Sequence, residues 1–175
     1  MKIYLIRHGQ STSDVEDRYG GDYDDHLTEK GEQQAKELAK SLKGKGIQAV
    51  FCSPRFRAKE TAEIVSKDLN APLEVVEDFR ECNRYGIITG MVKAEAKEQY
   101  PDEVAKLGDY RNTVQGGENY DHFKLRVIAA FEQIKTLDYN TVAIITHAGP
   151  IRCLAREVLD MGELGNIADC QIFEL

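Results

Sequence analysis

Residues 3–9 read Ile-Tyr-Leu-Ile-Arg-His-Gly, and residues 142–149 read Val-Ala-Ile-Ile-Thr-His-Ala-Gly. Each stretch is a short aliphatic run that passes directly into polar residues, among them a histidine. Such a run is typical of a strand buried on both faces of a largely parallel sheet. If the two strands are parallel neighbours, both histidines leave the sheet at the same carboxyl edge. The two stretches therefore predict an α/β fold and the edge of the sheet where chemistry takes place.

Strands and helices alternate along the rest of the chain. Further strand-like runs cover 49–52, 73–76 and 172–175, and helical patterns cover 28–42, 54–71, 123–134 and 150–159. This alternation predicts a three-layer α/β/α sandwich with a mostly parallel central sheet and right-handed crossovers. Because no repeat, low-complexity tract or linker interrupts the pattern, we expect one domain over residues 1–175.

Two stretches lack a regular pattern. Residues 11–25 are polar and acidic, and residues 84–117 mix Gly, Lys, Glu and Tyr with a weak helical signal over 93–100. Long irregular segments in compact domains are often functional loops. In open α/β sheets, ligands bind beyond the carboxyl ends of the strands. We therefore expect both stretches at that edge, with residues 84–117 forming a substrate-specificity loop or lid.

Composition and charge narrow the class of protein. The 175 residues are 42% hydrophobic and 30% charged, as in ordinary globular proteins, and no aliphatic run approaches the ~20 residues of a membrane span. With 23 Lys and Arg against 30 Asp and Glu, the net charge is −7, which argues against nucleic acid as a partner. The four cysteines include no CxxC pair, and a strand begins directly after Met1-Lys2. We expect a reduced, cytoplasmic protein without a signal peptide or membrane partner.

The predicted carboxyl edge collects two guanidiniums and two imidazoles. Arg7 and His8 follow the first strand, His147 follows the strand over 142–146, and Arg57 lies at the start of the helix after the second strand. The planar fork of arginine matches phosphate oxygens, and a neutral imidazole can act as a nucleophile. This set indicates chemistry on a phosphoryl group.

Other kinds of site fit the residues less well. A metal centre is not favoured because no HExxH or C₂H₂ spacing occurs, and two arginines would repel a divalent cation. The Cys-x5-Arg loop of cysteine phosphatases would need arginine six positions after Cys52, where Ala58 stands. The P-loop pattern GxxxxGK[ST] is also absent. We expect neither a metal nor a cofactor.

Five short motifs occur in the order in which a known family carries them. They are LIRHGQS (5–11), LTEKG (27–31), SPRFR with ETA (53–57 and 60–62), GGE (116–118) and THAG (146–149). Together they resemble the histidine phosphatase superfamily, in its phosphoglycerate-mutase-like branch, over nearly the whole chain. The resemblance implies a phosphoglycerate mutase-like fold and a metal-independent phosphatase that acts on a small phosphomonoester.

The resemblance also implies roles for residues at the matching positions. His8 would attack phosphorus and become phosphohistidine. Arg7, Arg57 and His147 would bind the phosphoryl oxygens, and Gln10 is included among the phosphate-binding residues. Charge stabilisation by such groups is most of what a loose phosphoryl-transfer transition state requires.

Asp14 departs from the family pattern, which often has an asparagine in contact with the phosphate. A carboxylate there would repel a bound dianion unless it were protonated or turned outward. Asp14 lies within an acidic stretch that extends to Asp25. We interpret this stretch as a solvated surface loop, and Asp14 as an altered member of the phosphate-binding set.

The general acid has to come from a carboxyl group after the third strand. The candidates are Glu77, Asp78, Glu81 and Glu118. In the family the acid lies just before an aromatic-Gly pair, here Tyr85-Gly86. Glu81 precedes Tyr85 by four positions, whereas many relatives have three, and Cys82 occupies the matching position. Assuming a one-residue insertion, we choose Glu81 as the catalytic acid and keep Glu118 as the fallback.

Three functions remain open at this point. A phosphomonoester hydrolase ranks first. A phosphoglycerate-type mutase ranks second: residues 84–95 resemble a run found in mutases, but the chain is shorter than those enzymes and ends at a strand, without a tail to close over an intermediate. A non-catalytic phospho-ligand-binding domain ranks third and is motivated by Asp14 and the displaced Glu81. The oligomeric state is not predicted.

Overall fold

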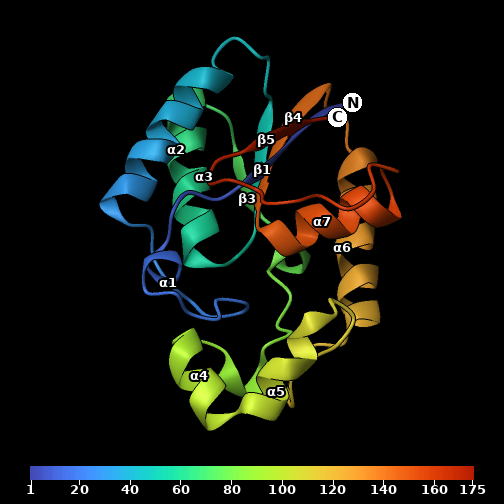
Figure 1. Ribbon diagram of the computed structural model, residues 1–175. Coiled ribbons are helices and arrows are strands. Elements are labelled where there is room, and N and C mark those ends of the chain that lie inside the picture. The colour runs from blue at the N-terminus through green and yellow to red at the C-terminus, as the bar shows by residue number, and fades with distance from the viewer.

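A five-stranded sheet forms the centre of the computed structural model, which describes all of residues 1–175 (Figure 1). Its strands are β1 (Lys2–Arg7), β2 (Ala49–Cys52), β3 (Leu73–Val75), β4 (Thr141–Thr146) and β5 (Ile172–Glu174). They lie in the order β3-β2-β4-β1-β5, and only β5 runs antiparallel to its neighbour. The predicted mostly parallel sheet is confirmed.

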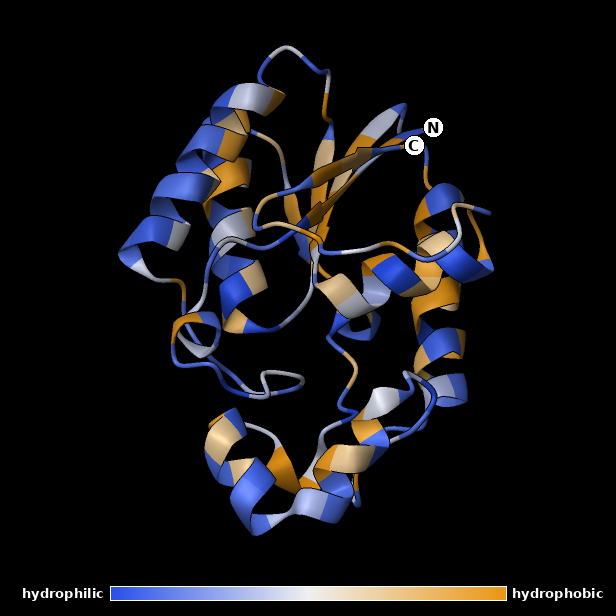
Figure 2. Ribbon diagram, viewed as in Figure 1, coloured by the Kyte–Doolittle hydropathy of each residue, from blue (hydrophilic) through white to orange (hydrophobic).

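Helices cover both faces of the sheet, as Figure 1 shows: α2 (Glu29–Leu42) and α3 (Phe56–Leu69) on one face, α6 (Tyr120–Lys135) and α7 (Ala148–Glu157) on the other. Successive residues of a strand point to opposite faces. In β1, Ile3 and Leu5 accordingly join the apolar cluster under α6 and α7, while Tyr4 and Ile6 join the cluster under α2 and α3. Figure 2 shows the apolar strands between helices with polar outer faces. The three-layer sandwich is confirmed.

The position of α7 differs in detail from the sequence prediction. The helix begins at Ala148, with His147 as its N-cap residue, rather than at Pro150, and it ends at Glu157 rather than Leu159. Pro150 thus falls inside the first turn. Because N–H groups of the first turn have no partner within the helix, a proline there costs no hydrogen bond.

The two segments without a regular pattern contain more helix than predicted. Residues 11–25 include the short helix α1 (Thr12–Val15), and residues 84–117 include α4 (Lys93–Gln99) and α5 (Pro101–Ala105). Three 3₁₀ turns complete the elements: η1 (Glu77–Phe79), η2 (Gly86–Ile88) and η3 (Lys106–Gly108). Elements this short present too few turns for a period of 3.6 to be recognised in the sequence. Segment 84–117 builds a small apolar cluster of its own, around Ile88, Ala96 and Val114.

These two segments meet each other beyond the carboxyl edge of the sheet. Arg18 and Val92 form an antiparallel bridge. The Tyr19 amide donates to the Met91 carbonyl at 3.0 Å, and the Gly90 amide donates to the Tyr19 carbonyl at 2.8 Å. Both segments therefore contribute to the walls of one cavity. No helix of the chain combines the length and the apolar character that crossing a bilayer requires.

Candidate active site

The two histidines come together because β1 and β4 are parallel neighbours. Arg7 is paired in register with Thr146, so the residues that follow, His8 and His147, leave the sheet side by side. Their ring centroids are 5.0 Å apart. His8 is 4% exposed and His147 is completely buried. The sequence-based expectation that both imidazoles share one edge of the sheet is met.

The hydrogen bonds of His8 define its tautomer. Nδ1 lies 2.7 Å from the carbonyl oxygen of Gly9, which can only accept, so Nδ1 carries the proton. Nε2 therefore has the lone pair, and it accepts a hydrogen bond from Nε of Arg57 at 3.2 Å. Burial, with the nearby charges of Arg57 and Arg7, lowers the pKa of His8 to about 3. At neutral pH this imidazole is uncharged and presents a nucleophilic nitrogen.

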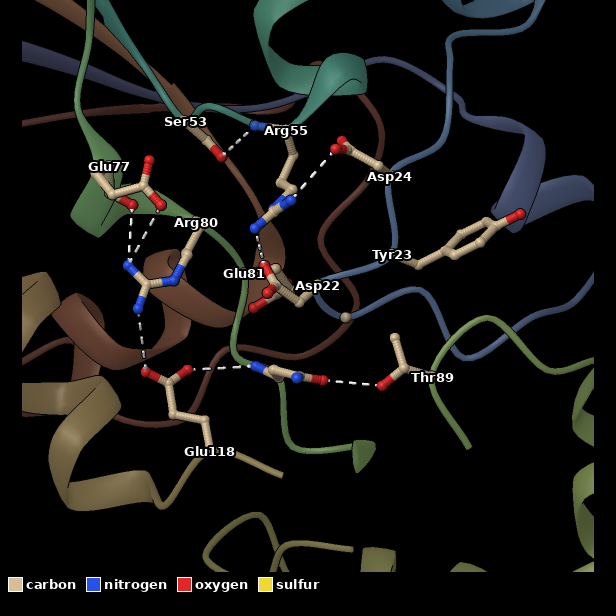
Figure 3. Close-up of polar contacts among 12 residues, drawn as sticks. Asp22, Tyr23, Asp24, Ser53, Arg55, Glu77, Arg80, Glu81, Thr89 and Glu118 are labelled. Atoms are coloured by element: carbon tan, nitrogen blue, oxygen red, sulfur yellow. Dashed lines mark hydrogen bonds and ion pairs between the residues drawn. The ribbon is translucent and has the colours of Figure 1, made fainter. Parts of the chain in front are cut away.

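His147 is held by a hydrogen bond at its Nε2. Its Nε2 lies 2.7 Å from the hydroxyl of Ser53, and that oxygen already accepts from the Arg55 amide at 3.3 Å (Figure 3). In the tautomer in which the Ser53 hydroxyl donates to Nε2, the ring proton of His147 is on Nδ1, as it is in His8. That nitrogen is buried and has no hydrogen-bonding partner in the protein. Burial, followed by the charges of Arg57 and His8, holds the pKa of His147 well below its usual range.

Arg57 is only 3% exposed, and its guanidinium is held from several sides. Besides His8, its donors contact the carbonyls of Tyr23 (2.7 Å) and Gly21 (2.8 Å) and a carboxylate oxygen of Asp25 at 2.5 Å. Burial raises the pKa of Asp25, but Arg57 and hydrogen bonds from two serines outweigh it, and the net shift is downward.

The interpretation of residues 11–25 as a solvated loop is therefore wrong at Asp25, which is 3% exposed. A guanidinium buried beneath the segment requires an anionic partner, and Asp25 supplies it. The same segment supplies Asp22 and Asp24, which pair with Arg55 beside the start of α3 (Figure 3).

Arg7 lies between two carboxylates. Nη1 donates to the Ile167 carbonyl at 2.6 Å and lies 3.3 Å from Asp169, while Nη2 lies 3.1 Å from Asp14. Its Nε is buried without a partner in the protein. The second oxygen of Asp14 accepts from the Ser11 amide at 2.9 Å and so caps α1. Asp14 is not turned away: it faces Arg7 and lines the cavity.

Gln10 is not among the residues that line this cavity. Its side-chain oxygen accepts a hydrogen bond from the Thr28 hydroxyl at 2.9 Å, and its backbone amide donates to the side-chain oxygen of Gln34 at 2.8 Å. Gln10 therefore joins the strand end to the start of α2. The structure brings Arg7, Asp14 and Arg57 together in the cavity lining. His147 is fully buried beside His8, outside that lining, and Gln10 lies outside the group.

The candidate acids are separated clearly by the fold. Glu81 lines the cavity, and its two oxygens accept from the backbone amides of Cys82 (2.8 Å) and Gly149 (3.0 Å). The close approach requires glycine at 149: a Cβ built there would lie 1.9 Å from Oε1 of Glu81. Glu81 is thus fixed to the first turn of α7, two residues beyond His147.

Glu118 lies outside the cavity lining and has a different set of contacts. Both of its oxygens accept from Arg126, each at 2.7 Å, and Figure 3 shows it next to Arg80. Burial raises the pKa of Glu118, but the contacts with Arg126 outweigh it, and the net shift is downward. Glu77 and Asp78 pair with Arg80, also outside the cavity lining.

The cavity has a volume of about 290 Å³ and is lined mainly by polar and charged side chains. Its size suits a small metabolite. Among its lining residues, Arg152 has no role in the sequence analysis, and Arg84 enters it only as the first residue of the mutase-like run 84–95. Arg152 could have been found from the helical spacing, because it follows Gly149 by three residues and so shares its face of α7. No cluster of three or more His, Cys, Asp or Glu side chains is arranged to hold a metal ion.

An α/β sandwich with two buried histidines and two arginines at its carboxyl edge defines a class of phosphoryl-processing proteins. Comparison with known proteins gives the family: residues 3–172 match the histidine phosphatase superfamily (branch 1), and the chain belongs to it. The chain is 31% identical over 158 residues to phosphoserine phosphatase 1 of Hydrogenobacter thermophilus, covering 88% of this chain and 74% of that protein.

Two further relatives show the range of the family. The chain is 30% identical to the 2,3-bisphosphoglycerate-dependent phosphoglycerate mutase of Parvibaculum lavamentivorans over 89% of this chain and 79% of that protein. Among solved structures, YhfR of Bacillus stearothermophilus superimposes with a TM-score of 0.89 at 28% identity, covering 99% of this chain and 89% of that one. The phosphoglycerate mutase-like fold is thereby confirmed, and relatives named as phosphatases support a phosphatase.

Proposed function

We propose that the protein hydrolyses small phosphomonoesters through a phosphohistidine at His8. One observation carries this proposal: the buried imidazole of His8 is uncharged and presents the lone pair of Nε2 to Arg57. Its proton is held on Nδ1 by the hydrogen bond to the Gly9 carbonyl. A nucleophilic nitrogen beside a fixed positive charge suits attack on a phosphoryl dianion.

The phosphoryl oxygens need donors that the protein does not otherwise use. Arg7 Nε and His147 Nδ1 are buried and have no partner in the protein, and Nδ1 is a donor in the tautomer in which Ser53 donates to Nε2. Leaving a donor unpaired costs about 1–3 kcal/mol, which hydrogen bonds to phosphoryl oxygens would recover. As the new N–P bond forms, the Nε–H group of Arg57 would exchange its hydrogen-bond acceptor, from Nε2 of His8 to a phosphoryl oxygen.

Glu81 is the proposed acid. In the first step Nε2 of His8 bonds to phosphorus, the ester P–O bond breaks, and Glu81 gives its proton to the leaving oxygen. In the second step Glu81 takes a proton from water, the hydroxide oxygen bonds to phosphorus, and the P–N bond breaks. The products are alcohol and phosphate, and His8 regains its lone pair.

Several finer points belong to the same proposal. We propose that catalysis needs no metal because Arg7, Arg57 and His147 supply the charge and hydrogen bonds. Residues 84–117 would act as the specificity segment of a single domain over residues 1–175. The four free cysteines suit a reducing compartment, in agreement with a cytoplasmic protein.

Phosphoglycerate mutase activity is the second candidate, favoured by the 30% identity to a mutase over most of both chains. Both activities begin with the same phosphohistidine. They differ in the acceptor, which is water for the hydrolase and a phosphoglycerate hydroxyl for the mutase. Release of phosphate from 3-phosphoglycerate, measured beside its isomerisation, distinguishes them.

His8→Ala tests the proposal directly. We expect loss of phosphate release, and in the wild type a trapped, acid-labile and base-stable phosphoryl adduct on His8 in a single turnover. EDTA should leave wild-type turnover unchanged. Full activity of His8→Ala, or strong inhibition by EDTA, contradicts the mechanism. Phosphate binding without turnover in the wild type would favour a non-catalytic ligand-binding domain.

A further inference from the structure

Positive charge is distributed unevenly among the residues that line the cavity. Seven cationic side chains contribute to its walls, and five of them have a carboxylate partner. The five paired cations are Arg7 with Asp14 and Asp169, Arg18 with Glu16, Arg57 with Asp25, Lys93 with Asp17, and Arg156 with Glu163. The remaining two cations, Arg84 and Arg152, form no ion pair.

Backbone carbonyls hold these two arginines in place. Nη2 of Arg84 donates to the carbonyls of Leu107 (3.2 Å) and Asp109 (2.7 Å). Arg152 donates from Nε to the Leu164 carbonyl at 3.4 Å and from Nη2 to the Gly165 carbonyl at 2.9 Å. Carbonyls orient a guanidinium without neutralising it. In both residues Nη1 makes no hydrogen bond within the protein, so a directed donor and a net charge remain for a ligand.

Both arginines come from the two segments that position Glu81. Arg84 follows Glu81 by three residues in the segment between η1 and η2. Arg152 follows Gly149, whose amide binds Glu81, by three residues on the same face of α7, a rise of roughly 4.5 Å along the helix. The cations beside His8, Arg7 and Arg57, are already paired with carboxylates. We infer that the uncompensated charge lies beside Glu81, where the leaving group of a phosphomonoester would be.

We propose, resting on the hydrolase function above, that Arg84 and Arg152 form a second anion subsite. The substrate is then a phosphomonoester whose alcohol carries another anionic group, a carboxylate or a second phosphate, a few bonds from the ester oxygen. The planar fork of arginine matches both groups. A compact trianionic or tetraanionic metabolite fits the cavity volume of about 290 Å³.

The test compares two esters of equal size. Phosphoglycolate carries a carboxylate where 2-hydroxyethyl phosphate carries a hydroxymethyl group, and ethylene glycol bisphosphate provides the second-phosphate arm. We expect kcat/KM of the wild type to be at least tenfold higher for one of the anionic esters. Arg84→Gln and Arg152→Gln should each reduce that preference about tenfold, mainly through KM, and Arg152→Lys should retain most of it.

Arg18→Gln is the matched control because Arg18 lines the same cavity but has a carboxylate partner, Glu16. It should change turnover of the anionic and neutral esters by the same factor. A wild-type enzyme that prefers 2-hydroxyethyl phosphate overturns the subsite. So do variants of Arg84 and Arg152 that slow both esters equally, since that result would indicate a purely structural role.

Failure of the hydrolase function gives a different result, in which no ester, including p-nitrophenyl phosphate, is hydrolysed. The subsite is then tested by calorimetric titration with the same esters. Binding of phosphoglycolate or the bisphosphate at least tenfold tighter than binding of 2-hydroxyethyl phosphate, lost in Arg152→Gln, supports it. Equal affinities for all three esters overturn it.

Discussion

Replacing Gly149 by alanine should separate the stability of this protein from its chemistry. The new Cβ would lie 1.9 Å from Oε1 and 2.8 Å from the carboxyl carbon of Glu81, distances that no real structure tolerates. Gly149 lies in the first turn of a helix, whereas Glu81 is a flexible side chain, so the carboxylate has to move. It loses its hydrogen bond from the Gly149 amide.

The effect on stability should be small. Alanine in place of glycine favours a helix by up to about 1 kcal/mol. A lost hydrogen bond to a neutral group, as for the protonated form in which Glu81 would act, costs about 0.5–1.5 kcal/mol. The net change in the free energy of unfolding is therefore on the order of 1 kcal/mol or less. Gly108→Ala serves as the control because a Cβ there meets no atom within 4 Å.

The effect on catalysis should be much larger and should depend on the leaving group. General acid catalysis contributes about 10²–10⁴-fold. With Glu81 displaced, kcat/KM for an alkyl ester such as 2-hydroxyethyl phosphate should fall by a factor in that range. Turnover of p-nitrophenyl phosphate should fall far less, because p-nitrophenolate leaves without a proton. Equal losses on both esters, or full alkyl phosphatase activity in a folded variant, would refute the assignment of Glu81.

Three further results are expected. Glu118→Gln should lower the melting temperature, because it weakens a half-buried ion pair, and should leave the dependence on leaving group unchanged; a selective loss on alkyl esters would exchange the roles of Glu118 and Glu81. In NMR titrations the His8 ring should remain uncharged until the pH approaches its pKa of about 3. The free energy of unfolding should fall as the pH decreases from about 6.5 towards 3, because only the unfolded chain takes up a proton on this histidine in that range. A titration midpoint near 6.5 would contradict the burial argument. Asp14→Asn should lower the inhibition constant of inorganic phosphate roughly tenfold, because one nearby charge is worth on the order of 1–2 kcal/mol. Asp169→Asn should not lower it, because Asp169 also pairs with Arg7 but lies outside the cavity lining. Equal effects of the two substitutions would show that only the pairing of Arg7 matters.

The placement of the two histidines was predictable because it depends on the periodicity of the strands alone. Two aliphatic runs buried on both faces had to be central strands, and parallel neighbours bring His8 and His147 to one edge. The choice of Glu81 over Glu118 followed from counting residues back from Tyr85. The fold agrees with the choice to the extent that Glu81 alone of the two lines the cavity.

The directions of side chains within the irregular segments could not be predicted from the sequence. Asp25 is buried because a guanidinium from another element lies beneath it, a condition that no local pattern records. Gln10 stands two residues from His8, yet it turns towards Thr28. The start of α7 was misplaced by two residues because Pro150 is equally acceptable throughout a first turn.

Segment 84–117 has an apolar cluster separate from the two clusters that pack against the sheet. Substitutions far apart, with no shared neighbours, have additive effects on stability. Changes around Ile88 or Val114 therefore leave the hydrogen-bonded register that sets the spacing of the two histidines untouched. A lineage can remodel the pocket wall in one part of the gene while the phosphoryl chemistry is inherited intact in another, and laboratory chimaeras that exchange only residues 84–117 start from the same advantage.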